Sequence, residues 1–161
     1  MKPLLSKINL RIYFIVICGL GITACGNSDS AMDMYNASSQ EVGLTPAEIN
    51  WGACPASLGS ESKCAAIEGN PKNPGPFTLR LNLPAQTKFA PHWHPGIEHV
   101  TVLSGVLHLV SGDDLSAAKA KAYPAGSYLV LPAKMPMMGW VSEHSELQLH
   151  GVGPWGMTAI K

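Results

Sequence analysis

The stretch PHWHPGIE at positions 91–98 decides how this chain is interpreted. Two histidines one residue apart, His92 and His94, point to the same face if the backbone is extended, because successive side chains of a strand alternate sides. Pro95 and Gly96 then turn the chain, and Glu98 opens a second alternating run, EHVTVL at positions 98–103. If Glu98 lies on the inward face of that run, one carboxylate and two imidazoles converge on a point.

Such a set of donors has the composition of a metal site with room for chemistry. The imidazoles of His92 and His94 and the carboxylate of Glu98, on one side of a divalent ion, form a facial triad that leaves coordination positions open. The expected cofactor is therefore a divalent transition metal, with iron, manganese, zinc and copper as the candidates. The alternative is a degenerate site in which the three side chains keep their mutual hydrogen bonds without an ion.

The spacing His92-x-His94-x3-Glu98-x6-Gly105 resembles the first sequence motif of the cupin superfamily, whose members are small antiparallel β-barrels with the metal inside. The resemblance implies an all-β fold, a single cupin barrel (double-stranded β-helix, or jelly roll) over residues 44–161 with a loop-rich N-terminal extension. The family motif also has a glycine six residues before the first histidine. Here that position is Gln86, a turn position that holds no ligand.

The second cupin motif, which supplies a fourth ligand, is only half present. Gly126, five further residues and Pro132 match its first half. In its second half, Lys134 replaces the expected glycine, Met137 replaces the expected histidine, and Val141 stands where asparagine is common. The resemblance therefore leaves the fourth metal ligand open.

Met137 admits two interpretations. A thioether is a soft ligand that suits copper and is poor for hard ions, so this substitution could favour copper as the bound metal. Alternatively, Met137 is a core residue that fills the volume of the missing imidazole, as methionine readily does. Loss of the fourth protein ligand need not abolish binding, since water can occupy the position.

Thirteen prolines and sixteen glycines, many of them between short apolar runs, favour an all-β chain. Ser104 and Gly105 predict a hairpin between the strands on either side. Residues 51–76 are expected to form a loop, and 113–122 a loop or one helical turn. Strands are expected at 77–83, 88–94, 98–103, 106–110, 127–131, 139–141, 146–152 and 155–160.

The other histidines are expected outside the barrel. Alternation places His99 on the face opposite to Glu98, and hairpin pairing across Ser104–Gly105 would place His108 outside as well. His144 lies in a polar loop. His150 also faces outward, unless a register break at Gly151 turns it towards the cavity.

Residues 1–24 are typical of an export signal. A basic start precedes an apolar run at 12–22, which is shorter than the roughly 20 residues that span a bilayer. The run ends in Ile22-Thr23-Ala24-Cys25, which resembles the lipobox of bacterial lipoproteins and implies a lipidated Cys25; the alternative is a plain secretory signal. The resemblance implies a membrane-anchored protein of the cell envelope that faces the periplasm or exterior, and Gly26 favours the outer membrane.

After removal of Cys18 with the signal and lipidation of Cys25, two cysteines remain, Cys54 and Cys64. An even pair in an exported chain predicts a disulfide that closes a short loop. A redox or metal role for these two cysteines is the alternative. Residues 25–43, which are polar and without periodicity, are expected to form the lipidated cysteine and a flexible tether to the domain.

The charge of the chain excludes one class of partner. The full sequence has eleven basic and eleven acidic side chains, and three of the basic ones lie in the predicted signal. The mature chain then has a net charge of about −3 and no basic patch, so nucleic acid is not an expected partner. A homodimer is expected only by analogy, because cupins often pair through edge strands.

Three functions remain open. The first is a metalloenzyme that acts on a small molecule in the barrel, either by Lewis-acid chemistry or as a dioxygenase. The second is a non-catalytic lipoprotein that binds or senses a metal or ligand. The third is a structural lipoprotein with an inactive barrel, against which the intact triad argues. Because the fold hosts many reactions, it cannot select one of them.

Overall fold

The computed structural model describes residues 41–160. The predicted signal, the Cys25 lipidation site and most of the predicted tether lie outside the described residues. Within residues 41–160, no helix is long and apolar enough to cross a membrane. The regular structure of this part is β-strand apart from short 3-10 helices, namely η2 (Pro46–Glu48), η3 (Ala56–Leu58) and η4 (Ala117–Lys119).

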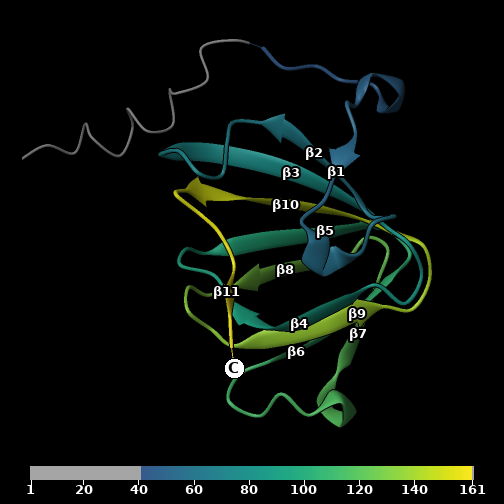
Figure 1. The fold of residues 1–161 in the computed structure, drawn as a ribbon, viewed down its shortest axis with the longest axis vertical. Coiled ribbons are helices and arrows are strands. Elements are labelled where there is room, and N and C mark those ends of the chain that lie inside the picture. The colour runs from purple at the N-terminus through teal and green to yellow at the C-terminus, as the bar shows by residue number, and fades with distance from the viewer. Residues whose placement is uncertain (1–40, 161) are drawn as a thin grey trace, which may run out of the picture.

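The strands form two antiparallel sheets that face each other (Figure 1). The six-stranded sheet contains, in spatial order, β1 (Gly52–Ala53), β2 (Lys63–Glu68), β3 (Gly75–Leu83), β10 (Ser145–Gly153), β5 (Glu98–Ser104) and β8 (Tyr128–Leu131). The five-stranded sheet contains β11 (Thr158–Ala159), β4 (Lys88–Trp93), β9 (Met137–Val141), β6 (Val106–Ser111) and β7 (Lys121–Pro124). The predicted all-β barrel is therefore confirmed.

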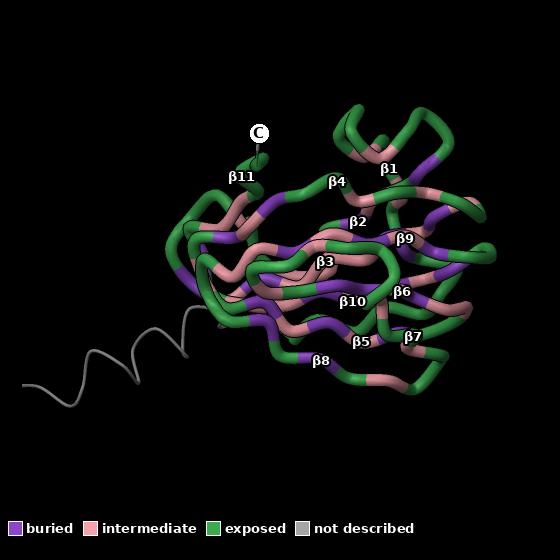
Figure 2. Tube along the Cα trace, turned by 90° about the horizontal axis from the view of Figure 1, so that it is seen from below, coloured by how far each residue is buried: buried purple, intermediate pink, exposed green. Residues whose placement is uncertain are grey.

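Alternating side chains fill the space between the sheets. In β3, Phe77, Leu81 and Leu83 are buried while Thr78 and Arg80 are partly exposed. A similar alternation of buried and partly exposed positions runs along β5, β9 and β10 (Figure 2). Each fully buried aliphatic side chain contributes roughly 1.5–3 kcal/mol. The two sheets share one core cluster, made of Leu81, Leu83, Val100, Val102, Leu107, Leu109, Leu129, Leu131, Met137, Val141, Leu147 and Leu149.

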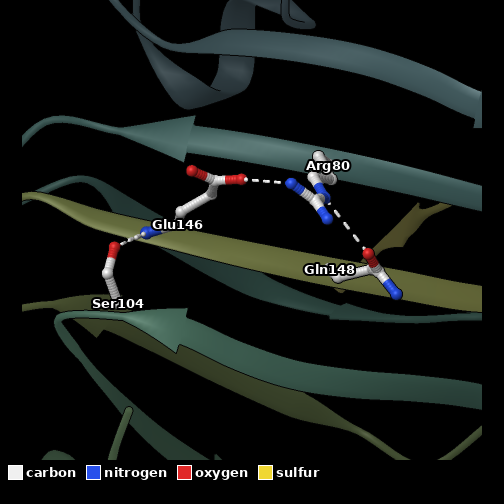
Figure 3. A network of polar contacts seen from close by, with 4 residues as sticks. All are labelled: Arg80, Ser104, Glu146 and Gln148. Atoms are coloured by element: carbon white, nitrogen blue, oxygen red, sulfur yellow. Dashed lines mark hydrogen bonds and ion pairs between the residues drawn. The ribbon is translucent and has the colours of Figure 1, made fainter. Parts of the chain in front are cut away.

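The outer face of the six-stranded sheet is polar around Arg80. Its guanidinium contacts the carboxylate of Glu146 and the side-chain oxygen of Gln148, both at 3.1 Å, and thereby connects β3 to β10 (Figure 3). The hydroxyl of Ser104 accepts a hydrogen bond from the backbone N–H of Glu146 at 3.1 Å. Because these groups are partly exposed, the ion pair adds little stability.

The predicted hairpin across Ser104–Gly105 is wrong. β5 pairs with β10 and β8 in the six-stranded sheet, whereas β6 pairs with β9 and β7 in the other sheet. Gly105 is the corner between the sheets. It has φ 77°, and a Cβ there would lie 2.0 Å from Ser145 Oγ, so only glycine fits.

Two strands lie where the sequence predicts loops. β2 lies in the predicted loop 51–76 and pairs with β3, and β7 lies at the end of the predicted loop 113–122 and pairs with β6. Residues 54–62 form a loop between β1 and β2. A disulfide between Cys54 and Cys64, the second residue of β2, closes this loop, and the two Cα atoms are 4.9 Å apart. The loop carries η3 and contributes residues to the interior cavity described below.

The two turn positions at which cupin motifs have glycine are left-handed in this chain. Gln86 has φ 67° and Lys134 has φ 61°, and among the residues described they alone combine a side chain with positive φ. A left-handed backbone brings Cβ close to the following carbonyl oxygen and is unfavourable for L-residues. Both turns therefore have a backbone conformation that glycine would adopt without this cost.

Replacing Lys134 by glycine is expected to stabilise the domain by about 0.5–1 kcal/mol, because glycine adopts positive φ without the Cβ penalty. Lys134 is exposed, and its backbone N–H donates to the carbonyl of His94, a bond that glycine keeps. Urea unfolding of both proteins measures the difference. Lys134→Ala is the matched control, since alanine retains the Cβ; an equal gain in both variants would show that the left-handed backbone is not the cause.

Candidate metal and ligand site in the barrel

His92, His94 and Glu98 meet at the inner surface of the barrel. His92 is the penultimate residue of β4, His94 follows the strand by one residue, and Glu98 is the first residue of β5. The i, i+2 spacing places both imidazoles on the inner face, and the turn at 95–97 brings the carboxylate back towards them. The side chains are almost fully buried, with exposed fractions of 6%, 4% and 3%.

His94 lies between the other two donors. Its Nε2 is 3.1 Å from Nε2 of His92 and 3.4 Å from Oε2 of Glu98. The two rings are nearly perpendicular, with centroids 4.8 Å apart. Two nitrogen donors about 2.1 Å from one ion and at right angles would lie roughly 3 Å apart, so the spacing of the imidazoles suits a shared ion.

Backbone carbonyls fix the tautomer of both histidines. Nδ1 of His92 is 2.6 Å from the carbonyl oxygen of Ala90, and Nδ1 of His94 is 2.7 Å from that of Gly156. A carbonyl can only accept, so each Nδ1 carries the proton and each Nε2 presents a lone pair. The two lone pairs face each other and cannot hydrogen-bond, which is the arrangement that a cation satisfies.

Burial keeps all three groups neutral near pH 7 when no ion is present. It lowers the pKa of His92, and it lowers the pKa of His94 to about 4. The hydrogen bond from His94 to the carbonyl of Gly156 raises the pKa of His94 and so offsets part of this effect. Burial also raises the pKa of Glu98 to about 8. In the metal-free protein the 3.4 Å contact between His94 Nε2 and the Glu98 carboxyl is thus a contact between two neutral groups.

The stability of the metal-free domain is expected to fall as the pH rises from 6.5 to 8. Glu98 is protonated in the folded chain but ionised in the unfolded chain, whose carboxyl pKa is 4.5, so unfolding releases a proton over this range. Ionisation of Glu98 then lowers the stability by at most about 1.4 kcal/mol per pH unit. Near pH 6.5 this fall is partly offset, because the lowered pKa values of His92 and His94 make unfolding take up protons there. Urea unfolding in EDTA measures the profile. Glu98→Gln cannot ionise and should lose the fall between pH 7 and 8; an unchanged fall in this variant would assign it to another group.

The C-terminal segment holds His94 from two sides. The indole of Trp155 stacks on the His94 ring, with centroids 4.3 Å apart and planes 15° apart, and the carbonyl of Gly156 accepts from its Nδ1. Beyond these residues, β11 pairs with β4 so that Ala159 lies opposite His92. The sequence predicted an edge strand at 155–160 but assigned it no part in the site. From sequence alone, neither Trp155 nor Gly156 indicates a contact with His94, which lies 61 and 62 residues earlier in the chain.

A cavity of about 230 Å³ adjoins the three donors. Of the residues around it, Pro55, Ser57 and Met157 are the solvent-exposed ones, so the cavity opens between the disulfide loop and the C-terminal segment. The rest of the wall is core. It is made of Leu58, Cys64, Leu79, Leu81, Phe89, His92, His94, Glu98, Val100, Leu107, Leu109, Leu131, Met137, Leu147, Leu149 and Trp155.

The three donor side chains are close together, but their arrangement is not that of a complete metal site. Within residues 41–160, no group of three or more His, Cys, Asp or Glu side chains has the arrangement of a metal site. His94 contacts both His92 and Glu98, whereas the structure gives no ion pair between His92 and Glu98, both of which it describes.

Comparison with solved structures settles the fold. No protein-family model and no curated protein matches the chain. An acetylacetone dioxygenase from Acinetobacter johnsonii is similar at 17% identity and a TM-score of 0.59, over 91% of this chain and 85% of that one. An RmlC-like cupin from Shewanella frigidimarina NCIMB 400 is similar at 12% identity and a TM-score of 0.54, over 69% and 89%. The fold is the cupin fold.

A further cupin-type neighbour has higher identity. It is a candidate acetylacetone dioxygenase from Methylibium petroleiphilum PM1, at 22% identity and a TM-score of 0.59, and the match covers 76% of this chain and 82% of that one. At these identities the likeness establishes the cupin barrel and does not establish an activity.

Met137 lies in the cupin barrel at the position expected of a fourth ligand. It is the first residue of β9 and pairs with His92 across β4 and β9. Its side chain is 2% exposed, belongs to the core cluster and lines the cavity. Met137 is thus buried, as a core methionine would be, and it lies beside His92, as a metal ligand would. The structure is compatible with both roles.

The remaining histidines lie outside the cupin cavity. His99 and His150 pair across β5 and β10 on the outer face, with ring centroids 4.6 Å apart, and His99 Nδ1 is 2.5 Å from the hydroxyl of Tyr128. His108 stacks on Trp140 and contacts Ser142. These contacts follow from the pairing of β6 with β9, which replaces the hairpin predicted between the strands on either side of Ser104–Gly105.

Proposed function

We propose that this cupin binds one divalent transition metal through His92, His94 and Glu98 and receives a small molecule in the adjoining cavity. One observation carries the proposal. Two Nε2 lone pairs, each fixed by a backbone carbonyl, face each other and a carboxyl group in an otherwise apolar wall. Without a cation this arrangement leaves two acceptors in contact and buried, which is unfavourable.

Iron, manganese, zinc and copper are all compatible with two imidazoles and a carboxylate. Participation of Met137 would favour copper, because a thioether is a soft ligand, while water in that position would suit the other ions. When bound, such an ion supplies Lewis acidity towards a substrate oxygen or, in the case of iron, reactivity with dioxygen. Two similar structures are described as an acetylacetone dioxygenase and a candidate acetylacetone dioxygenase, which supports the latter chemistry.

A binding or sensing protein is the second candidate, and the cavity wall favours it. Glu98 is assigned as a ligand and is then not free to act as a base. Among the described residues that line the cavity, no other carboxylate, lysine or tyrosine is present. A reaction that needs proton abstraction would therefore depend on the substrate or on water, whereas a binding function needs no such group.

Metal analysis tests the proposal. The protein is purified without a histidine tag, and bound elements are quantified by inductively coupled plasma mass spectrometry. About one equivalent of iron, manganese, zinc or copper is expected. Absence of metal after reconstitution with each of these ions would contradict the proposal and favour a barrel that works without a metal.

We further propose that the cupin domain is anchored to a membrane of the cell envelope through a lipidated Cys25, as the lipobox-like sequence at 22–25 suggests. Replacing Cys25 by serine is expected to release the protein from the membrane fraction or to leave it unprocessed. Cell fractionation and gel mobility measure both effects. Cys18→Ser, within the predicted signal, is the matched control and should behave as wild type. Normal processing of Cys25→Ser with membrane retention would contradict the anchor.

A further inference from the structure

The cavity wall is polar at one end only. Apart from Ser57 at the opening, its hydrogen-bonding side chains are His92, His94, Glu98 and Trp155, and the stacking of Trp155 on His94 shows that they cluster together. The rest of the described wall is hydrocarbon and sulfur. It contains no lysine or arginine that could pair with a carboxylate or phosphate away from the donors.

From this asymmetry we infer the ligand class: a molecule with a hydrocarbon body about the size of one substituted ring and a single oxygen-bearing end that faces the donors. The inference rests on the proposed function and specifies its substrate. Sugars, amino acids and nucleotides are excluded, because each hydroxyl or charge placed along the apolar wall would lose its water without gaining a partner.

The volume of the cavity limits the size of the ligand's hydrocarbon body. An apolar cavity of about 150 Å³ accepts benzene. The cavity here is about 230 Å³, which leaves room for a ring and a short substituent. A second ring or a long chain would have to extend through the opening between the disulfide loop and the C-terminal segment.

The polar end contains a hydrogen-bond donor without a partner. Nε1 of Trp155 is buried and has no hydrogen-bond acceptor among the described residues, although nearly all buried side-chain donors in proteins have one. Because Trp155 lines the cavity beside His94, the acceptor that we assign to Nε1 is the oxygen of a bound molecule, and the indole must turn slightly to reach it, since Nε1 is covered in the empty cavity. The same oxygen would then lie at the end of the cavity where the metal is proposed.

Three probes of similar size test the ligand class on the full-length protein kept metal-free with EDTA. Acetophenone has a ring and one carbonyl oxygen, ethylbenzene has a ring and no oxygen, and xylose carries hydroxyls throughout. Isothermal titration calorimetry and ligand-observed NMR should detect binding of both aromatic molecules and none of xylose. Xylose binding as tight as that of acetophenone, or no binding of either aromatic molecule, would overturn the inference.

A variant tests the assigned hydrogen bond. Trp155→Phe keeps a ring against His94 but removes Nε1, so its affinity for acetophenone should fall about fivefold, the size of one net hydrogen bond, while its affinity for ethylbenzene stays within twofold. An equal fall for both molecules would mean that Trp155 acts by shape alone. If the variant fails to fold, the comparison of the three probes in the wild type still decides the ligand class.

The same titrations separate this inference from the proposed function. A protein that binds the aromatic probes in EDTA but takes up no metal retains the ligand class and loses the metal proposal. A protein that takes up one equivalent of metal but binds neither aromatic probe, with or without the ion, retains the metal proposal and loses the ligand class.

Discussion

Replacing His94 by alanine is expected to abolish stoichiometric metal binding. His94 is the donor that contacts both of the others, at 3.1 Å from His92 and 3.4 Å from Glu98, so its loss separates the remaining two. Loss of groups that merely orient a ligand lowers metal affinity about 10–100-fold, and loss of a ligand itself should exceed that range. Mass spectrometry of bound metal and metal titration against a competing chelator measure the effect.

His150→Ala is the matched control, because it removes an imidazole from the outer face of the same barrel. It should retain one equivalent of metal and wild-type affinity. Circular dichroism and thermal unfolding confirm that both variants are folded. Unchanged stoichiometry in folded His94→Ala would place the ion, if one binds, elsewhere in the molecule.

Removal of residues 155–161 is expected to weaken metal binding about 10–100-fold without removing any ligand, since such losses are typical when the partners that orient a metal-bound histidine are lost. The deletion takes away both constraints on His94, the stacked indole of Trp155 and the carbonyl of Gly156. The freed imidazole can rotate, and its Nδ1 no longer has an acceptor from this segment. Competition with a chelator of known affinity measures the change.

Removal of residues 158–161 is the control for this deletion. It deletes β11 but keeps Trp155 and Gly156, so the affinity should stay close to that of wild type. Trp155→Ala, which removes the ring stacked on His94, covers the case in which the longer deletion does not fold. Equal losses in the short and long deletions would show that strand pairing along β4, and not the contacts to His94, positions the site.

The sequence was most informative where residue type and alternation coincide. His92 and His94 are two residues apart and Glu98 begins an alternating strand, and the structure places the three side chains close together inside the barrel. Their burial follows from the same alternation that buries Val100 and Val102 in β5. These features are local, and a strand periodicity of two determines them without knowledge of the partner strands.

Pairing between distant segments could not be predicted in the same way. β7 is an edge strand with mostly exposed residues, and β2 contains small residues, so neither has a strong alternating pattern. The Ser104–Gly105 pair predicts a hairpin, but a corner between two sheets needs the same kind of residues. The choice between them depends on Ser145, which packs against Gly105 from 40 residues away.

The degenerate motif positions show how the fold tolerates sequence change. Gln86 and Lys134 keep the left-handed turns that glycine normally makes, and Gln86 gains a side-chain hydrogen bond to the carbonyl of Ser142. Met137 keeps a buried place opposite His92. The backbone of these turns and the burial of Met137 are thus compatible with residues other than the glycines and histidine that the resemblance predicts.

We propose that the ion lies at His92, His94 and Glu98. A crystal structure of the metal-loaded protein, with an anomalous difference map collected at the absorption edge of the bound element, tests it most directly. We predict one peak about 2.0–2.2 Å from Nε2 of both histidines and from a carboxylate oxygen of Glu98. A peak elsewhere, for example at the outer pair His99 and His150, with none inside the barrel, would contradict the claim.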